Sequence, residues 1–179
     1  MKIKVYIKRI NKELRLPKII AKGEWIDLMA SEITKFNAPQ SGTLKTRKVG
    51  NTEEKYRNVS FDTKLIPLGV AMKLPEGFEA HILPRSSTAK GFGLVCGNSQ
   101  GIVDTSYCGN DDEWKFSAIA IRETTINMGE RICQFRIELS QKATIWQKIK
   151  WLLSNGIELV EVDNLSDNNR SGFGSTGVN

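Results

Sequence analysis

The sequence opens on MKIKVYIK, residues 1–8, in which the apolar residues Ile3, Val5 and Ile7 alternate with polar or lysine positions. A period of two is expected where one face of a β-strand is buried and the other meets water, so this segment is predicted to be a strand. Four more segments have strand character: KLIPLGVAMKL (64–74), EAHILPR (79–85), FSAIAIRETT (116–125) and ERICQFRIEL (130–139). Turn-forming pieces such as PEG and NMGE separate them, and the pattern predicts an all-β barrel or sandwich.

Length and composition fit one compact domain, because the chain has 179 residues and 40% hydrophobic content. No apolar run approaches the roughly 20 residues that cross a bilayer. The first residues also lack the apolar block of a signal peptide, so we expect a cytoplasmic protein with no membrane contact. Cys96, Cys108 and Cys133 have neither zinc-site spacing nor the density of a disulfide scaffold, and free thiols are expected.

The net charge of +6 is concentrated at one end of the chain. Residues 1–22 hold eight Lys or Arg side chains against the single acid Glu13, whereas the remaining 18 basic and 19 acidic residues nearly cancel. A duplex-binding surface needs a broad basic face, and these lysines instead occupy the polar side of one predicted strand. We therefore expect no nucleic-acid partner.

Three segments depart from the strand pattern. Residues 37–60 are polar and without apolar periodicity, which predicts an inserted long surface loop or a loose hairpin. Residues 144–156 place Ile145, Ile149, Leu152 and Leu153 at helical spacing, which predicts one short inserted amphipathic helix ended by Gly156. Residues 166–179 are polar and glycine-rich, which predicts a flexible tail after a domain spanning 1–165.

The tail segment RSGFGSTG, residues 170–177, combines glycines, hydroxyls, a cation and a ring. Glycine backbone N–H groups with Ser175, Thr176 and Arg170 suit an anion, and Phe173 offers a face for stacking on a base. The alternative is a flexible tail of ordinary composition.

In GNSQGIVDTSYCG, residues 97–109, a short strand leads into Asp104, and Tyr107 follows three residues later. A turn would place the two side chains together. An aspartate on a rigid hairpin can act as a general base for water, and a tyrosine ring packs against a sugar. The alternative is an ordinary β-turn aspartate beside a cross-strand tyrosine.

Two further segments carry weaker signals. PRSSTAKGFG, residues 84–93, follows a strand and would present Ser86 and Ser87 to phosphate, with Arg85 nearby. WIDLMASE, residues 25–32, places Asp27 where it could hold Mg²⁺ through water. Either segment alone is also common in ordinary loops.

Several other chemistries lack the residues they need. His81 is the only histidine, so a histidine metal cluster or a Ser-His-Asp triad is not expected, and His81 is interpreted as structural. No P-loop segment is present, and GFGLVCG lacks the strand and helix context of a dinucleotide fingerprint.

In chain order these segments resemble the five motifs of the trimeric dUTPase family, of bacterial or phage type. WIDLMA resembles the first motif, PRSSTAKGFG the second, GNSQGIVDTSYCG the third, GERICQF the fourth and RSGFGSTG the fifth. The order carries the resemblance, because five matches in sequence on an all-β pattern are poorly explained by coincidence.

The resemblance implies a jelly-roll-like β-barrel that forms a homotrimer with shared active sites. It implies hydrolysis of dUTP to dUMP and pyrophosphate with Mg²⁺, which limits uracil incorporation into DNA and supplies dUMP for dTMP synthesis. Asp104 would be the general base, Tyr107 would pack beneath deoxyribose, and Asp27 would reach the metal through water. Backbone groups of the hairpin, at Asn98, Gly101, Ile102 and Val103, would read uracil.

The remaining residues implied by the resemblance serve the phosphates and the closing tail. Arg85, Ser86, Ser87, Arg131 and Gln134 would bind the phosphates at a subunit boundary. The tail would cover a neighbouring subunit's site, stacking Phe173 on uracil and bringing Arg170, Gly174, Ser175 and Thr176 to the γ-phosphate.

Two alternatives stay open at this stage. A dCTP deaminase, or a bifunctional relative, has a similar fold and would use a glutamate such as Glu138. A phage-type dUTPase could also bind a repressor protein through residues 37–60 as an added regulatory role.

Overall fold

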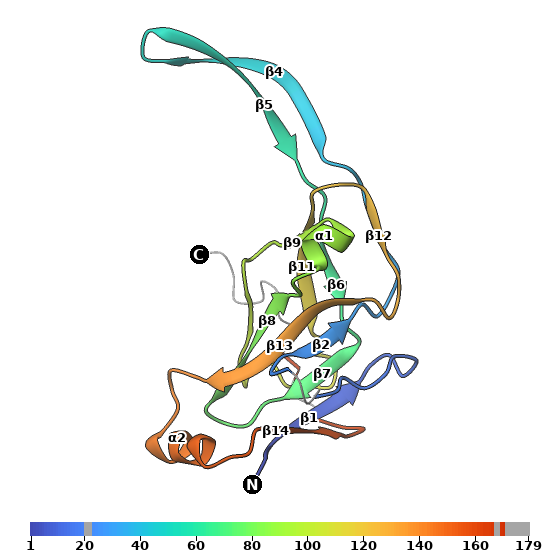
Figure 1. Cartoon of the computed structure of the whole chain (residues 1–179), viewed down its shortest axis with the longest axis vertical. Coiled ribbons are helices and arrows are strands. Elements are labelled where there is room, and N and C mark those ends of the chain that lie inside the picture. Colours follow the sequence, from blue (N-terminus) through green and yellow to red (C-terminus); the bar gives the residue numbers. More distant parts are fainter. Residues whose placement is uncertain (20–22, 167–168, 171–179) are drawn as a thin grey trace.

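The structure, a computed structural model, describes residues 1–19, 23–166 and 169–170, and this part consists mainly of strands (Figure 1). In chain order the strands are β1 (Ile3–Arg9), β2 (Ile26–Met29), β3 (Thr34–Phe36), β4 (Gln40–Val49), β5 (Thr52–Ser60), β6 (Thr63–Pro67), β7 (Val70–Lys73), β8 (Phe78–Pro84), β9 (Leu94–Cys96), β10 (Gly101–Val103), β11 (Lys115–Ala120), β12 (Thr124–Ile126), β13 (Arg131–Leu139) and β14 (Ile157–Glu161). The helices in the described residues are α1 (Thr88–Phe92) and α2 (Ile145–Leu152). The all-β prediction is confirmed.

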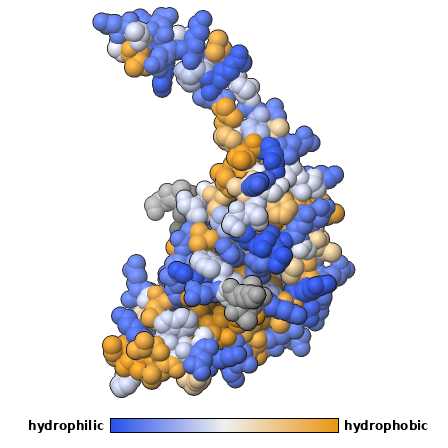
Figure 2. Space-filling model, viewed as in Figure 1, coloured by the Kyte–Doolittle hydropathy of each residue, from blue (hydrophilic) through white to orange (hydrophobic). Residues whose placement is uncertain are grey.

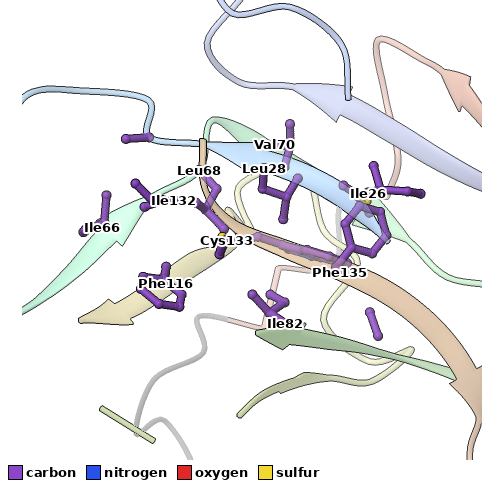
Figure 3. Close-up of a cluster of buried hydrophobic side chains, with 14 of the residues drawn as sticks. Ile26, Leu28, Ile66, Leu68, Val70, Ile82, Phe116, Ile132, Cys133 and Phe135 are labelled. Carbon is purple, nitrogen blue, oxygen red and sulfur yellow. The ribbon is translucent and has the colours of Figure 1, made fainter. Parts of the chain in front are cut away.

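The sheets surround one hydrophobic core. A four-stranded sheet has the order β10-β8-β13-β2, and two three-stranded sheets have the orders β14-β1-β7 and β6-β11-β9. Side chains from β2, β8, β11 and β13 meet in this core (Figure 3), and Ile26, Leu28, Ile82, Phe116 and Phe135 are each at most 2% exposed. Packed antiparallel sheets around one core agree with the predicted jelly-roll class.

Strand β1 has the predicted burial pattern. Ile3, Val5 and Ile7 are at most 2% exposed, while Lys4 and Tyr6 between them face solvent. The strand pairs antiparallel with β7 and parallel with β14. The N-terminal lysines therefore line the polar side of a strand, as the alternation indicates.

Strands β4 and β5 form a hairpin that projects from the body of the molecule (Figure 1). Val49 pairs with Thr52 across a two-residue turn, in which Gly50 has a φ of 61°. Every residue of both strands is exposed. Of the two structures that the sequence allows for residues 37–60, the structure has the hairpin. No apolar alternation marks these strands, because neither face is buried.

The helix predicted over residues 144–156 is present but shorter, and it ends at Leu152. It begins at a capping box, in which the Thr144 side chain accepts from the Gln147 N–H and the Gln147 side chain accepts from the Thr144 N–H. Gly156, predicted to end the helix, has a φ of 86° and instead turns the chain into β14. The sequence pattern does not reveal β14, because its side chains are only partly buried.

Part of the predicted tail is described. Ser166, Asn169 and Arg170 are hydrogen bonded to the loop formed by residues 110–112. Phe173, Gly174, Ser175 and Thr176 lie outside the described residues. In the part of the chain that is described, neither helix has the length and apolar character needed to cross a membrane.

Candidate active site

Strand β13 brings Asp27, Arg85 and Arg131 together, and we call these three residues the Asp27 cluster. β13 pairs with β2, where Gln134 lies opposite Asp27, and with β8, which ends just before Arg85. Arg85 Nε donates to Asp27 Oδ1 at 2.7 Å, and Arg131 Nη1 donates to Asp27 Oδ2 at 3.0 Å. Residues from three sequence motifs thus form one hydrogen-bonded group.

A buried threonine holds the loop that carries Arg85. The Arg85 N–H donates to Thr88 Oγ1 at 3.0 Å, and the Thr88 hydroxyl donates to the Ile132 carbonyl at 2.7 Å. Ser86 and Ser87, beside Arg85, are exposed to solvent. Sequence reasoning misses Thr88, because its partner is 44 residues away along the chain.

The Asp27 cluster lies beside a cavity of about 730 Å³, which Asp27, Arg131 and the loop of residues 13–18 help to line. Gln134, on the same strand as Arg131, donates through its side chain to the Pro84 carbonyl at 3.4 Å. The phosphate-binding residues predicted from the second and fourth motifs are therefore neighbours.

The Asp27 cluster can hold a magnesium ion only through water molecules. Within residues 1–19, 23–166 and 169–170, no three His, Cys, Asp or Glu side chains are grouped to hold a metal. Both oxygens of Asp27 already accept from guanidinium groups, but each keeps a lone pair that can accept a hydrogen bond from water. An ion could be held here if phosphate and water supplied its ligand oxygens.

Asp104 directly follows β10, whose residues pair with β8 so that Val103 lies opposite Ala80. Its carboxylate accepts from the Ser106 N–H at 2.8 Å, from the Ser106 hydroxyl, and from Arg170 Nη1 at 3.1 and 3.2 Å. Partial burial raises the pKa of Asp104, but the Ser106 hydrogen bonds and the Arg170 charge outweigh it, so the pKa lies below its usual value. We call Asp104, Ser106, Tyr107 and Arg170 the Asp104 cluster.

Tyr107 is joined to Asp104 by a turn, as predicted, since its N–H donates to the Asp104 carbonyl at 3.2 Å. Its hydroxyl donates to the Glu113 carbonyl at 2.9 Å. Burial first, and then the charges of Asp112 and Glu113, raise the pKa of Tyr107 to about 12, so the phenol stays neutral. The residue can offer a ring for packing but no charge.

Residues 97–103 do not form the predicted hairpin, because β9 pairs with β11 whereas β10 pairs with β8. The backbone of this segment is nevertheless constrained. Ser99 has a φ of 61°, and the Gln100 N–H donates to the Asn98 carbonyl at 2.6 Å. The Cys96 thiol donates to Asn98 Oδ1 at 3.0 Å, and a Cβ on Gly101 would come within 3.2 Å of Ile82 Cβ. The backbone groups of Asn98, Gly101, Ile102 and Val103 are therefore held in a defined arrangement.

Arg170 is positioned by a carboxylate that sequence reasoning misses. Its N–H donates to the two Asp112 carboxylate oxygens at 2.9 and 3.1 Å, and Asp112 is 1% exposed. Asp112 also accepts from the Gly109 N–H at 2.8 Å. Ser106 is two residues from Asp104, and this proximity is the signal that could have identified it. Asp112 has no such signal, because its partner Arg170 is 58 residues away along the chain.

The two clusters lie at opposite ends of β8. Val103 is opposite Ala80, and Arg85 is five residues farther along β8. At about 3.3 Å per strand residue the two positions are roughly 17 Å apart. The side chains of Asp104 and Arg85 from the same chain therefore cannot contact one phosphorus atom.

Glu138, on which the deaminase alternative depends, lies on β13 opposite Glu79. Its Oε1 accepts from Arg136 Nε at 2.6 Å. His81 lies on β8, where its Nε2 is 2.9 Å from Glu79 Oε1. These polar groups form a network on the sheet, which the Gln100 side chain joins through His81 Nδ1.

Comparisons with known proteins identify the family. The sequence model of the dUTPase family matches residues 52–177. The SPbeta prophage-derived deoxyuridine 5'-triphosphate nucleotidohydrolase YosS of Bacillus subtilis is 41% identical over 170 residues, covering 95% of this chain and 90% of that protein. A deoxyuridine 5'-triphosphate nucleotidohydrolase of Maricaulis maris is 31% identical, covering 80% and 86%.

Solved structures agree on the fold. The dUTPase of Streptococcus mutans has a TM-score of 0.58 at 21% identity, covering 77% of this chain and 98% of that chain. A Staphylococcus bacteriophage 80alpha dUTPase has a TM-score of 0.55 at 17% identity, covering 97% and 98%. The chain has a dUTPase-type β fold, and it belongs to the dUTPase family.

The Asp104 geometry predicts a measurable coupling. Arg170→Gln should raise the pKa of Asp104, because the charge that favours its ionised form is lost. Carboxyl carbon NMR titration would measure this pKa directly. Arg9→Gln removes a comparable ion pair with Glu161 and should leave Asp104 unchanged. An Asp104 titration insensitive to Arg170→Gln would refute the contact.

Proposed function

We propose that this chain hydrolyses dUTP to dUMP and pyrophosphate. Its membership of the dUTPase family and the names of its relatives support the substrate. The observation that carries the proposal is Asp104, which is kept ionised by Ser106 and Arg170 just after the constrained segment of residues 97–103. An ionised carboxylate in that position can accept a proton from water.

In the proposed reaction a water oxygen attacks the α-phosphorus. A bond forms between them, the bond to the oxygen bridging the α- and β-phosphorus breaks, and pyrophosphate leaves. Asp104 accepts the proton of the attacking water. Arg170 keeps Asp104 ionised but also makes it a weaker base. We infer that substrate phosphates attract the guanidinium group away from Asp104 and so increase its basicity as the site closes.

Recognition of the nucleoside would use the constrained segment of residues 97–103 and Tyr107. The backbone N–H and C=O groups of Asn98, Gly101, Ile102 and Val103 would complement uracil, mismatch the amino group of cytosine and leave no space for the thymine methyl group. The neutral ring of Tyr107 would pack against deoxyribose and exclude a 2′-hydroxyl.

Recognition of the triphosphate would use the Asp27 cluster. Arg85, Ser86 and Ser87 would bind phosphate oxygens, and Arg131 and Gln134 would support them from β13. Asp27 would accept a hydrogen bond from a water bound to Mg²⁺, and this ion would reduce the negative charge that opposes attack. A solved dUTPase of phage phi11 of S. aureus coordinates a structural Mg(II) ion.

We propose that the active sites are shared in a homotrimer. The roughly 17 Å between Ala80, which lies opposite Val103, and Arg85 supports this, because one chain supplies two half-sites and a neighbour must complete each. The tail beyond Arg170 would then close over a neighbouring site, with Phe173 on uracil and Gly174, Ser175 and Thr176 at the γ-phosphate, while Arg170 stays at the site of its own Asp104. Closure would exclude bulk water.

Replacing the proposed base tests this mechanism. Asp104→Asn should retain dUTP binding within a few-fold but reduce kcat by about three or more orders of magnitude, because an amide cannot accept the proton. Pyrophosphate release measures turnover and calorimetry measures binding. Substrate preference is tested with dTTP, dCTP and UTP, and ammonia release from dCTP would support the deaminase instead. Substantial residual turnover in Asp104→Asn would reject Asp104 as the base.

A second proposal concerns the β4–β5 hairpin. Phage 80alpha dUTPases control the transfer of virulence genes. In the present chain the hairpin is exposed along its whole length and projects away from both clusters. We propose that it forms a binding surface for a repressor protein, in addition to the catalytic function.

Deleting residues 41–59 and joining the ends with two glycines should separate the two functions. Turnover of dUTP should stay within about twofold, because both clusters lie outside the hairpin. Binding of a purified repressor that recognises the complete chain should be lost in calorimetry. Unchanged repressor binding, or loss of turnover in a folded deletion variant, would contradict the assignment.

A further inference from the structure

Helix α2 contacts the body of the protein through the side that carries Gln147 and Trp151. The Trp151 ring packs edge to face on Phe78, with ring centroids 5.3 Å apart. The Gln147 side chain lies so close to Gly77 that a Cβ there would come within 2.3 Å of its Oε1. The capping box fixes the first turn. The orientation of the helix on the body is therefore set by named contacts.

The apolar face of α2 points away from the protein. Ile145, Trp146 and Leu152 are 65%, 76% and 82% exposed, and Leu153, which follows the helix, is 72% exposed. Figure 2 shows this hydrophobic patch at lower left, where Figure 1 places α2. An amphipathic helix on a globular domain normally buries this face, and leaving several large apolar side chains in water costs about 1.5–3 kcal/mol each. The patch is therefore expected to be covered.

A groove of complementary character lies beside α2. Its volume is about 640 Å³, and Ile137, Leu139, Trp151 and Ile157 contribute apolar lining. The charged residues that line it are Glu24, Glu138 and Arg136, and Arg136 is ion-paired with Glu138. Among the described residues, the lining is thus apolar with a net negative charge.

The charges around the apolar face of α2 and in the groove favour one way of bringing these two surfaces together. Lys148 and Lys150 flank the apolar face, and the segment Ile145–Leu152 contains no acid. Two α2 faces packed against each other would bring lysines together, which is unfavourable. The same face set into the groove of another copy would place lysines near Glu24 and Glu138. The apolar face of α2 is therefore better covered by the groove of a second copy of this chain than by the α2 face of that copy.

We propose that α2 of one subunit docks into the groove formed by β13, β14 and α2 of the next subunit. This contact joins two different surfaces, and such head-to-tail contacts close into rings when repeated by rotation. The inference rests on the shared-site trimer proposed above and assigns the inserted helix a role in it. The docked helix stabilises the pairing that brings Asp104 of one subunit to the Asp27 cluster of another.

The first test measures subunit dissociation of the full chain by sedimentation and mass photometry. Leu152→Gln should raise the dissociation constant of the assembly at least about tenfold, because a central apolar contact is lost. Leu44→Gln is the matched control, since Leu44 is also an exposed leucine, 53% accessible, but lies in the hairpin. Assembly unchanged by Leu152→Gln would overturn the proposal and assign the face to another protein or to a lipid surface.

The second test identifies the contact. Subunits labelled with ¹⁴N and ¹⁵N are denatured, combined in equal amounts, refolded together and treated with a zero-length carbodiimide, which joins a lysine to a carboxylate in direct contact. Cross-links between Lys148 or Lys150 and Glu24 or Glu138 should include mixed-isotope pairs. Links confined to a single isotope would show contact within one chain only and would contradict docking.

The two proposals fail in distinguishable ways. Turnover of dUTP by the unaltered protein tests the catalytic assignment without reference to α2. Normal turnover with assembly insensitive to Leu152→Gln would reject the docking contact alone. Absence of turnover would reject the function, whereas the dissociation and cross-linking measurements would still decide where α2 binds.

Discussion

The pairing of β13 with β2 on one edge and β8 on the other determines where the candidate site residues lie. Phe135 and Ile137, two residues apart on one face of β13, are 0% and 5% exposed, and burying such side chains stabilises the fold by about 1.5–3 kcal/mol each. A slip of one residue would turn every side chain of the strand to the opposite face. Hydrophobic burial on one face of β13 thus fixes the register that places Gln134 opposite Asp27. The register shift between Arg131 and Cys133 then sets the position of Arg131, which contacts Asp27.

The candidate site residues of one chain form two half-sites, the Asp27 cluster and the Asp104 cluster, at different positions along β8. The Asp27 cluster, at its C-terminal end, has two guanidinium groups on one carboxylate, which suits a polyanion. The Asp104 cluster, near the other end, holds an ionised carboxylate and a neutral aromatic ring. In the proposed trimer these half-sites meet across subunit boundaries, so fold, assembly and activity depend on one another.

Sequence patterns predicted the elements that have one buried face. β1 and the core strands were recognisable because burial imposes alternation, and the order of motifs pointed to the family that the comparisons confirm. The sequence of residues 37–60 was compatible with either a loop or a hairpin. Both faces of the β4–β5 hairpin are in water, so its side chains show no alternation of apolar and polar residues. The periodicity of α2 predicted a helix but could not show that its apolar face points outward.

Residues that act through distant partners could not be predicted in the same way. Thr88 bonds to a carbonyl on β13, and Asp112 bonds to the Arg170 backbone, so their importance arises only once the chain has folded. From the sequence, Arg170 was predicted to bind phosphate, and in the folded chain its side chain contacts Asp104. The candidate roles of all these residues remain proposals, whereas their positions follow from the fold.

The most direct measurement mixes two defective proteins. Asp104→Asn and Arg85→Ala each damage a different half-site, and the two variants are denatured, combined in equal amounts and refolded together. With sites shared between subunits, about one site in four receives both intact halves, so dUTP turnover should recover to about a quarter of the unaltered level. A mixture no more active than either variant alone would contradict shared active sites.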